Sequence, residues 1–271
     1  MKMVLTARRK RLAEAFEAIY ANYNRRELVH PDPLEFLYRF DRVEDREIAA
    51  LVASSLAYGR VGIILKSVAA VLGAMGQSPR AFVENGSESE WRERFAGFRH
   101  RFTGGDDVAA LLGGIKRVLG EQPSLGAYLA AARKTRGTLE GALDALIETL
   151  EGGRKNTLLC RPALGSACKR HFLMLRWMVR HDEVDPGGWQ ALSPAELLVP
   201  LDVHMYAVCK ALRFTRRNSA DLKTAREITA VFAAMRPDDP VCYDFALTRF
   251  GIRPDMSEAE LLELCKTKRK E

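Results

Sequence analysis

The sequence predicts an all-α fold, and three observations support this prediction. Apolar residues recur at spacings of three and four through most of the chain, which is the period of an amphipathic helix. Alternating apolar and polar runs, which are typical of half-buried strands, are nearly absent. The connecting segments are rich in Gly, Pro and Asp, as in short links between helices. With 271 residues, 47% of them hydrophobic, the chain can fill a substantial core.

The predicted elements follow this periodicity along the chain. A first helix is expected over residues 8–24, and the prolines at 31 and 33 should follow its end. The apolar pattern of residues 48–75 is interrupted at Gly59, so we expect two helices that meet at a glycine joint. Further helices are expected at 79–84, 88–96, 105–119, 124–132, 138–150, 166–181, 193–198, 203–213, 221–235, 240–250 and 257–267.

Composition limits the classes of partner and cofactor. The chain has 42 Lys and Arg against 35 Asp and Glu, and a net charge of +7 favours polyanionic partners. Five cysteines at irregular positions are typical of a reducing cytoplasm, and residues 1–16 lack the apolar core of a secretory signal. We therefore expect a cytoplasmic protein without a membrane span. No CxxC or HExxH spacing is present, so we expect no structural zinc, no iron-sulfur cluster and no other bound metal. We expect no organic cofactor either.

The segment from Leu197 to His204, LLVPLDVH, ends in an aspartate that opens a new helix. Asp202 therefore lies at or near the N-cap, where a carboxylate accepts hydrogen bonds from free amides and faces the positive end of the helix dipole. Such a carboxylate is held rigidly and stays available for chemistry. Simple capping is the alternative interpretation.

The helix expected at 166–181 carries three cations on one stripe. Lys169, Arg176 and Arg180 are separated by steps that return to the same face, and the rest of the helix is largely apolar. Buried cations without acidic partners are costly, so the stripe must face water, carboxylates or an anion. The alternatives are an anionic ligand and ion pairs with acids such as Asp182, Glu183 or Asp185.

Lys169 precedes Asp202 by 33 residues, with a turn-rich connection and a short helix between them. Two packed helices could bring this amine and this carboxylate to one cleft. Such a pair suits attack at a sugar C1′ carbon, because the amine can form a Schiff base while the carboxylate stabilises oxocarbenium charge.

Three C-terminal segments carry a resemblance to a known superfamily. The segments PLDVHMYAVCKAL at 200–212, AREITAVF at 225–232 and DPVCYDFALTRFGI at 239–252 resemble the C-terminal half of helix-hairpin-helix DNA glycosylases. In that superfamily a Val/Leu-Asp-x-His segment supplies the catalytic aspartate, which falls on Asp202 here. The whole chain also resembles a bacterial family defined only as a domain of unknown function.

The DNA-gripping hairpin of that superfamily reads Leu-Pro-Gly-Val/Ile-Gly. The corresponding segment here is Asp185–Trp189, DPGGW, so Gly187 and Gly188 are the residues expected at the phosphate. The chain is most similar to the archaeal 8-oxoguanine glycosylase branch, which has a divergent hairpin and a catalytic lysine on the preceding helix. This resemblance implies Lys169 as the nucleophile, and the four-cysteine iron-sulfur motif of other branches is missing.

The resemblance implies two helical lobes with a cleft between them, residues 46–181 forming one lobe and residues 1–45 plus 182–271 the other. Phosphate contacts are expected from Arg176, Arg180 and Lys155. Residues expected near an extruded base are Tyr58, Arg60, Trp177 and His204. For Tyr58 and Trp177 ordinary core packing is the alternative.

Three functional hypotheses follow from these residues. The first is a DNA-repair N-glycosylase that removes a damaged base from duplex DNA, with 8-oxoguanine named first, and adds lyase chemistry through Lys169. The second is a nucleic-acid-binding protein that keeps the fold without the chemistry. The third is a helical scaffold in which the cations only pair with acids.

Overall fold

The structure is a computed structural model that describes residues 6–266. Residues 1–5, which belong to the segment in which no signal was predicted, and the end of the helix predicted at 257–267 lie outside the described part. Helices dominate, and the strands in residues 6–266 are the short pair β1 (Arg99–His100) and β2 (Thr103–Gly104). The predicted all-α class is confirmed.

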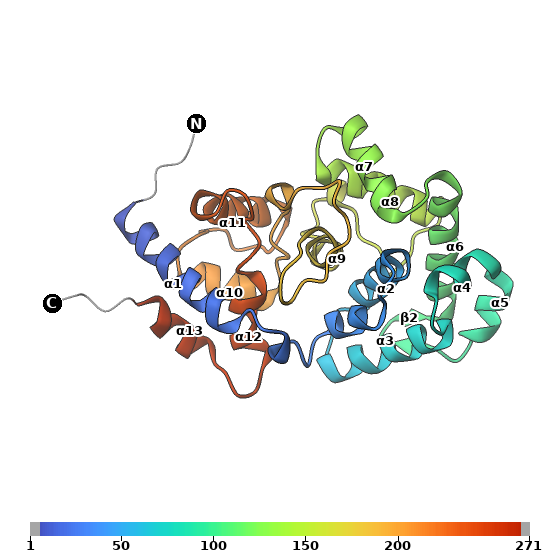
Figure 1. The fold of residues 1–271 in the computed structure, drawn as a ribbon, viewed down its shortest axis with the longest axis horizontal. Helices are drawn as coiled ribbons and strands as arrows, with labels where there is room; N and C mark the ends of the chain where they lie inside the picture. Colours follow the sequence, from blue (N-terminus) through green and yellow to red (C-terminus); the bar gives the residue numbers. More distant parts are fainter. Residues whose placement is uncertain (1–5, 267–271) are drawn as a thin grey trace.

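The first helix lies with the last ones at one end of the molecule (Figure 1). These elements are α1 (Ala7–Tyr23), α10 (Val203–Ala211), α11 (Leu222–Met235), α12 (Asp244–Ile252) and α13 (Glu258–Cys265). Phe16 of α1 packs against three aromatic rings, those of Phe214, Phe232 and Tyr243. Because α1 buries only one face, this cluster supplies the apolar contacts that hold it to the C-terminal segment.

The central part of the chain forms the other end (Figure 1). It contains α3 (Val61–Met75), α4 (Pro79–Asn85), α5 (Glu88–Arg94), α6 (Gly105–Glu121), α7 (Leu125–Arg136) and α8 (Leu139–Glu151). Ser and Thr residues cap four of these helices by accepting a hydrogen bond from a first-turn amide.

The helices α2 (Val43–Ser55) and α9 (Lys169–Val179) pack against each other between these two groups (Figure 1). Glu47 of α2 is fully buried and accepts hydrogen bonds from the amides of Leu125 and Gly126 and from the indole of Trp189. Burial raises the pKa of this carboxyl. One side chain therefore connects α2 to the start of α7 and to the loop after α9.

Three local features differ from the sequence prediction. The helix expected from residue 166 begins at Lys169, because Ser166 forms a bridge with Asp221 and Cys168 adopts a left-handed backbone with a φ of 45°. The segment 193–198 forms only the 3-10 turn η4 (Pro194–Glu196). The β1–β2 hairpin was not predicted.

The predicted joint at Gly59 is present. The helices α2 and α3 end and begin on either side of it, and Gly59 has a φ of +98°, which favours glycine. The 3-10 helices η1 (Arg26–Leu28), η2 (Pro33–Arg39) and η3 (Pro162–Leu164) complete the described helical elements.

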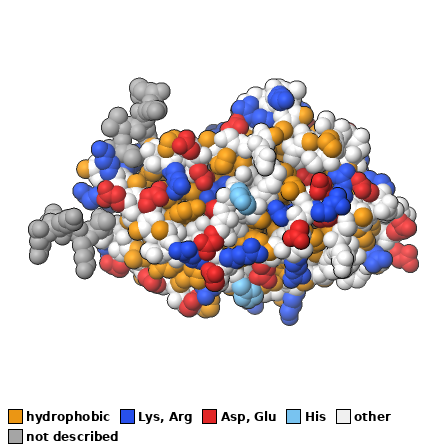
Figure 2. Space-filling model, in the orientation of Figure 1, with side chains coloured by type: hydrophobic (Ala, Val, Ile, Leu, Met, Phe, Trp, Pro, Cys, Tyr) orange, Lys and Arg blue, Asp and Glu red, His pale blue; other side chains and the backbone are white. Residues whose placement is uncertain are grey.

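No single helix among residues 6–266 has the length and apolar character needed to cross a membrane. Only α3 and α4 taken together reach that length and composition, and they are bent by 61° at the break between them. Basic and acidic side chains alternate over the face seen in Figure 2.

Candidate functional site

Asp202 is the N-cap of α10, as the sequence predicted. Its Oδ1 accepts a hydrogen bond from the amide of Met205 at 2.8 Å. The residue before the helix therefore satisfies one of the free first-turn amides, and this bond fixes the plane of the carboxylate. The second oxygen, Oδ2, takes no part in this bond and faces Lys169.

Lys169 reaches that second oxygen from α9. Its Nζ lies 3.9 Å from Asp202 Oδ2 and 3.5 Å from the carbonyl oxygen of Ala57. Lys169 is the first residue of its helix, where the positive end of the helix dipole opposes a cation. A lysine at this position therefore does not stabilise α9 through the helix dipole. Its amine instead contacts Asp202 and the carbonyl of Ala57, just after α2.

The two side chains line a cavity of about 500 Å³, a size that holds a small organic group such as a nucleobase. Apolar residues and backbone make up much of its wall, including the Gly59 joint and the start of α10. The lysine side chain is 31% exposed and the aspartate side chain 15%. Both polar groups are thus accessible from the cavity while remaining partly shielded from solvent.

A buried ion network forms part of the wall of this cavity. Arg176 of α9 donates to Asp185 at 3.2 Å and forms a second ion pair with Asp244, and all three side chains are at most 3% exposed. Arg249 of α12 donates to Asp32 at 2.7 Å. Buried charges need partners of opposite sign. Four members of these pairs line the cavity, namely Arg176, Arg249, Asp32 and Asp244, so their positive and negative charges are equal in number.

Asp244 is the most perturbed acid at the lining. Burial raises its pKa to about 6, the nearby Asp202 carboxylate adds to the rise, and Arg176 opposes it. Its Oδ1 is buried and has no hydrogen-bond partner among residues 6–266. In the sequence Asp244 is one residue of the segment DPVCYDFALTRFGI, and nothing near it indicates that it meets Arg176.

Comparison with known proteins assigns the chain to a family. The sequence matches the family described as "Protein of unknown function (DUF2400)" over residues 32–253. The chain belongs to this family. No curated protein and no solved structure matches the sequence. The matched range includes Lys169, Asp202 and the ion network, and every lining residue of the cavity except Pro31.

Five of the predicted site residues line the cavity, namely Arg176 and the four residues Tyr58, Lys169, Asp202 and His204. The hydroxyl of Tyr58 lies 2.6 Å from that of Thr103 and donates to the carbonyl of His100 at 3.1 Å, so this ring is held by the β1–β2 hairpin. His204 Nδ1 lies 3.4 Å from Glu258 Oε1.

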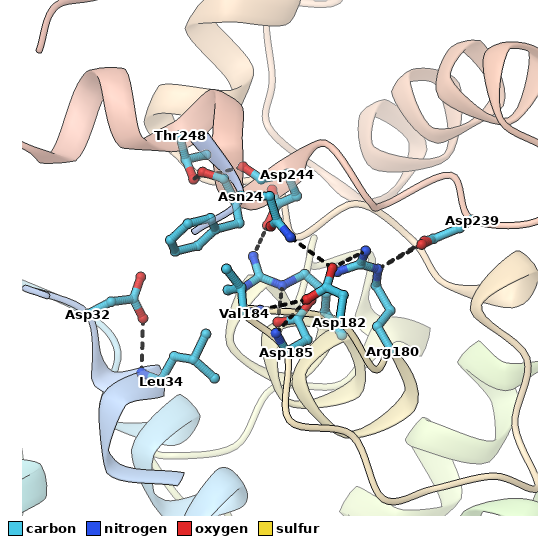
Figure 3. Close-up of polar contacts among 12 residues, drawn as sticks. Asn24, Asp32, Leu34, Arg180, Asp182, Val184, Asp185, Asp239, Asp244 and Thr248 are labelled. Carbon is cyan, nitrogen blue, oxygen red and sulfur yellow. Dashed lines mark hydrogen bonds and ion pairs between the residues drawn. The ribbon is translucent and has the colours of Figure 1, made fainter. Parts of the chain in front are cut away.

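Arg176 and Arg180 are buried and paired with carboxylates, so neither guanidinium is available to a phosphate, and that expectation is corrected. Each side chain is only 3% exposed and is enclosed by carboxylates, as Figure 3 shows for Arg180 with Asp182, Asp185 and Asp239. Ion pairing with acidic side chains, one of the two alternatives for the cationic stripe, therefore describes Arg176 and Arg180. Arg180 and the amides of the following loop lower the pKa of Asp182 to about 2 despite its burial.

The expectation for Gly187 is corrected as well. Its amide donates to the carbonyl of Trp177 at 3.0 Å and the residue is buried, so this amide is not available to a phosphate. Gly188 is exposed, with a φ of +140°. A Cβ on it would lie 2.8 Å from Val43, so the glycine serves close packing of this loop on α2.

The remaining predicted residues lie outside the cavity. Trp177 is fully buried in the core, which is the packing alternative and corrects the expectation that it meets a base. Lys155 is exposed on the loop after α8. Arg60 is exposed at the start of α3 and lines a neighbouring hollow that shares Tyr58 and Gly59 with the cavity. Within residues 6–266 no three His, Cys, Asp or Glu side chains are gathered to hold a metal ion.

Proposed function

We propose that this protein is a DNA N-glycosylase with lyase activity, built as a two-lobed helix-hairpin-helix glycosylase. The observation that carries the proposal is the 3.9 Å approach of Lys169 Nζ to Asp202 Oδ2 at the lining of one cavity. A nucleophile and a charge-stabilising carboxylate must both reach one reacting carbon, and these two groups share a cavity large enough for an extruded base. The sequence resemblance to the archaeal 8-oxoguanine branch supports the same two residues.

The chemistry divides between the two side chains. Lys169 attacks C1′ as the free amine, a C1′–N bond to the lysine forms, and the glycosidic C1′–N bond breaks with its electron pair leaving on the base. The proton lost from the lysine nitrogen balances the charge on the departing base. Asp202 Oδ2 stabilises the positive charge that develops on the sugar ring. Opening of the C1′–O4′ bond then gives a Schiff base, from which elimination cleaves the strand.

Borohydride trapping tests this proposal, because borohydride reduces a Schiff base to a stable amine. The protein is mixed with duplex oligonucleotides that carry 8-oxoguanine, uracil, an alkylated base or an abasic site, and the covalent adduct is measured. Adducts are expected with the wild type and not with Lys169→Met, which keeps the length of the side chain without the nucleophile. Lys134→Ala, which removes an exposed lysine of α7, is the matched control and should trap normally.

Two results would contradict the proposal. An adduct that persists in Lys169→Met would exclude this lysine as the nucleophile. Binding to DNA without an adduct or base release on any of these substrates would favour the second hypothesis, a nucleic-acid-binding protein without chemistry.

A further inference from the structure

The β1–β2 hairpin presents an exposed aromatic ring beside the cavity. Phe102 at its turn is 60% exposed, which is unusual for a phenylalanine in a chain whose other large rings are mostly buried. Its ring stacks on Tyr58, with the centroids 5.1 Å apart and the planes inclined by 22°. Since Tyr58 lines the cavity, the stack of two rings leads from the surface to the site of Lys169 and Asp202.

The hairpin is fixed in place, although each strand has only two residues. His100 is fully buried, and its ring lies 2.8 Å from Ser67 Oγ and 3.0 Å from the carbonyl of Tyr58. The Thr103 and Thr157 hydroxyls lie 2.8 Å apart. These contacts tie the hairpin to α3, to the joint and to the loop after α8, so the exposed ring sits on a rigid support.

Exposed cations lie on the hairpin and on the two segments that contact it. About half of the arginines in residues 6–266 lie within 4.0 Å of a carboxylate, whereas no described carboxylate lies that close to any cation of this group. The group consists of exposed residues from the joint, the hairpin and the loop after α8, namely Arg60, Arg99, Arg101, Arg154 and Lys155. Cations without acidic partners next to an exposed aromatic face are what a nucleic-acid strand requires, because its phosphates meet the charges and its bases meet the ring.

We propose that the hairpin surface formed by Phe102, Tyr58 and these five cations binds a DNA strand, with Phe102 stacked on a base next to the nucleotide that enters the cavity. The surface takes the place of the two glycines of the loop after α9, one of which has its amide occupied. An acidic protein segment could pair with the cations but offers no planar face to the ring. This inference rests on DNA as the partner in the proposed function and does not depend on the chemistry of Lys169.

The test measures DNA binding in the background of Lys169→Met, which should bind the strand without cleaving it. The substrate is a duplex that carries an abasic site flanked by 2-aminopurine. Phe102→Ser should weaken binding on the order of 10-fold and abolish the change in 2-aminopurine fluorescence, whereas Phe102→Trp should retain both. The matched control Leu264→Ala removes an exposed apolar side chain on α13 at the opposite end of the molecule and should change neither.

The charges are tested by the salt dependence of binding. The slope of log affinity against log salt is negative, and the double variant Arg99→Ala with Arg101→Ala should make it shallower. The magnitude of the slope should fall by about 0.7–0.9 for each phosphate that the variant no longer neutralises. Lys134→Ala on α7, a single exposed cation outside this surface, should leave the slope unchanged.

The outcomes separate this inference from the proposed function. Adduct formation by the wild type together with unchanged binding by the Phe102 and arginine variants would overturn the inference and leave the glycosylase proposal standing. Weakened binding by these variants without adducts on any lesion would support the inference and contradict the glycosylase. Absence of DNA binding by the wild type at low salt would overturn both.

Discussion

The carboxylate of Asp202 divides its two oxygens between the helix that it caps and Lys169. Oδ1 accepts from the Met205 amide at 2.8 Å, and Oδ2 lies 3.9 Å from Lys169 Nζ. The capping bond therefore orients the oxygen that faces the lysine. Capping and catalysis are compatible in this geometry, and the two roles can be separated by mutation.

Asp202→Asn should keep the cap and lose the charge. Asparagine caps helices about as well as aspartate, so the free energy of unfolding in urea should change by less than about 0.5 kcal/mol. Single-turnover base release should fall by about 100-fold or more, because a neutral amide does not stabilise sugar cation charge. Asp221→Asn, which alters the aspartate cap of α11 outside the cavity, serves as the control and should release base at the normal rate. Equal base release by Asp202→Asn and wild type would reduce Asp202 to a cap.

Arg176→Met should strongly destabilise the fold. The substitution leaves Asp185 and Asp244 buried without the guanidinium that pairs with both, and breaking such a pair typically costs about 3–5 kcal/mol. Urea unfolding at pH 7 measures the loss. Arg25→Met removes a pair with Glu183 in which both side chains are close to half exposed, so its cost should be below about 1 kcal/mol. Similar costs for the two variants would contradict the structural role assigned to Arg176.

Stability should depend on pH through Asp244. Because burial raises the pKa of this carboxyl from 3.8 to about 6, the folded state holds a proton that the unfolded state has already released between these pH values. The contribution of Asp244 to stability is therefore present below about pH 4 and is lost as the pH rises through 6. Asp244→Asn does not titrate, so its unfolding free energy should rise relative to that of the wild type from pH 4 to pH 6. A difference that stays constant over this range would show that the pKa of Asp244 is not raised.

The sequence predicted the helices well where local signals decide them. The Gly59 joint and the Asp202 cap depend on backbone conformation and capping chemistry within a few residues, and both are present. The β1–β2 hairpin escaped prediction because two residues per strand are too few to show an alternating pattern. The 3-10 turn at Pro194–Glu196 shows that a short apolar segment need not reach a full helix.

The site was harder to predict because its partners come from distant segments. Nothing near Arg176 in sequence indicates Asp244, which is 68 residues away. The sequence was therefore compatible with two partners for the cationic stripe, acidic side chains or an anionic ligand. The approach of Lys169 to Asp202 likewise depends on how the fold brings the start of α9 to the N-terminus of α10. Sequence could name both residues as chemically suited to each other, while the distance between them is a property of the packed fold.

Two glycines of α6 should respond to alanine in opposite directions. A Cβ at Gly114 would lie 2.2 Å from the carbonyl oxygen of Leu150, so Gly114→Ala forces α6 and α8 apart. We expect a loss of about 1–3 kcal/mol in the free energy of unfolding, as for other overpacked cores.

Gly120 on the same helix has open space, as far as the described residues show, at the position that a Cβ would take. Gly120→Ala should therefore stabilise the protein by about 0.4–1 kcal/mol, because alanine reduces the entropy of the unfolded chain. Thermal denaturation of both variants measures the pair. If Gly114→Ala were as stable as Gly120→Ala, the close approach of α6 to α8 would not exist in solution, and the wall of helices that supports the hairpin surface would be packed differently.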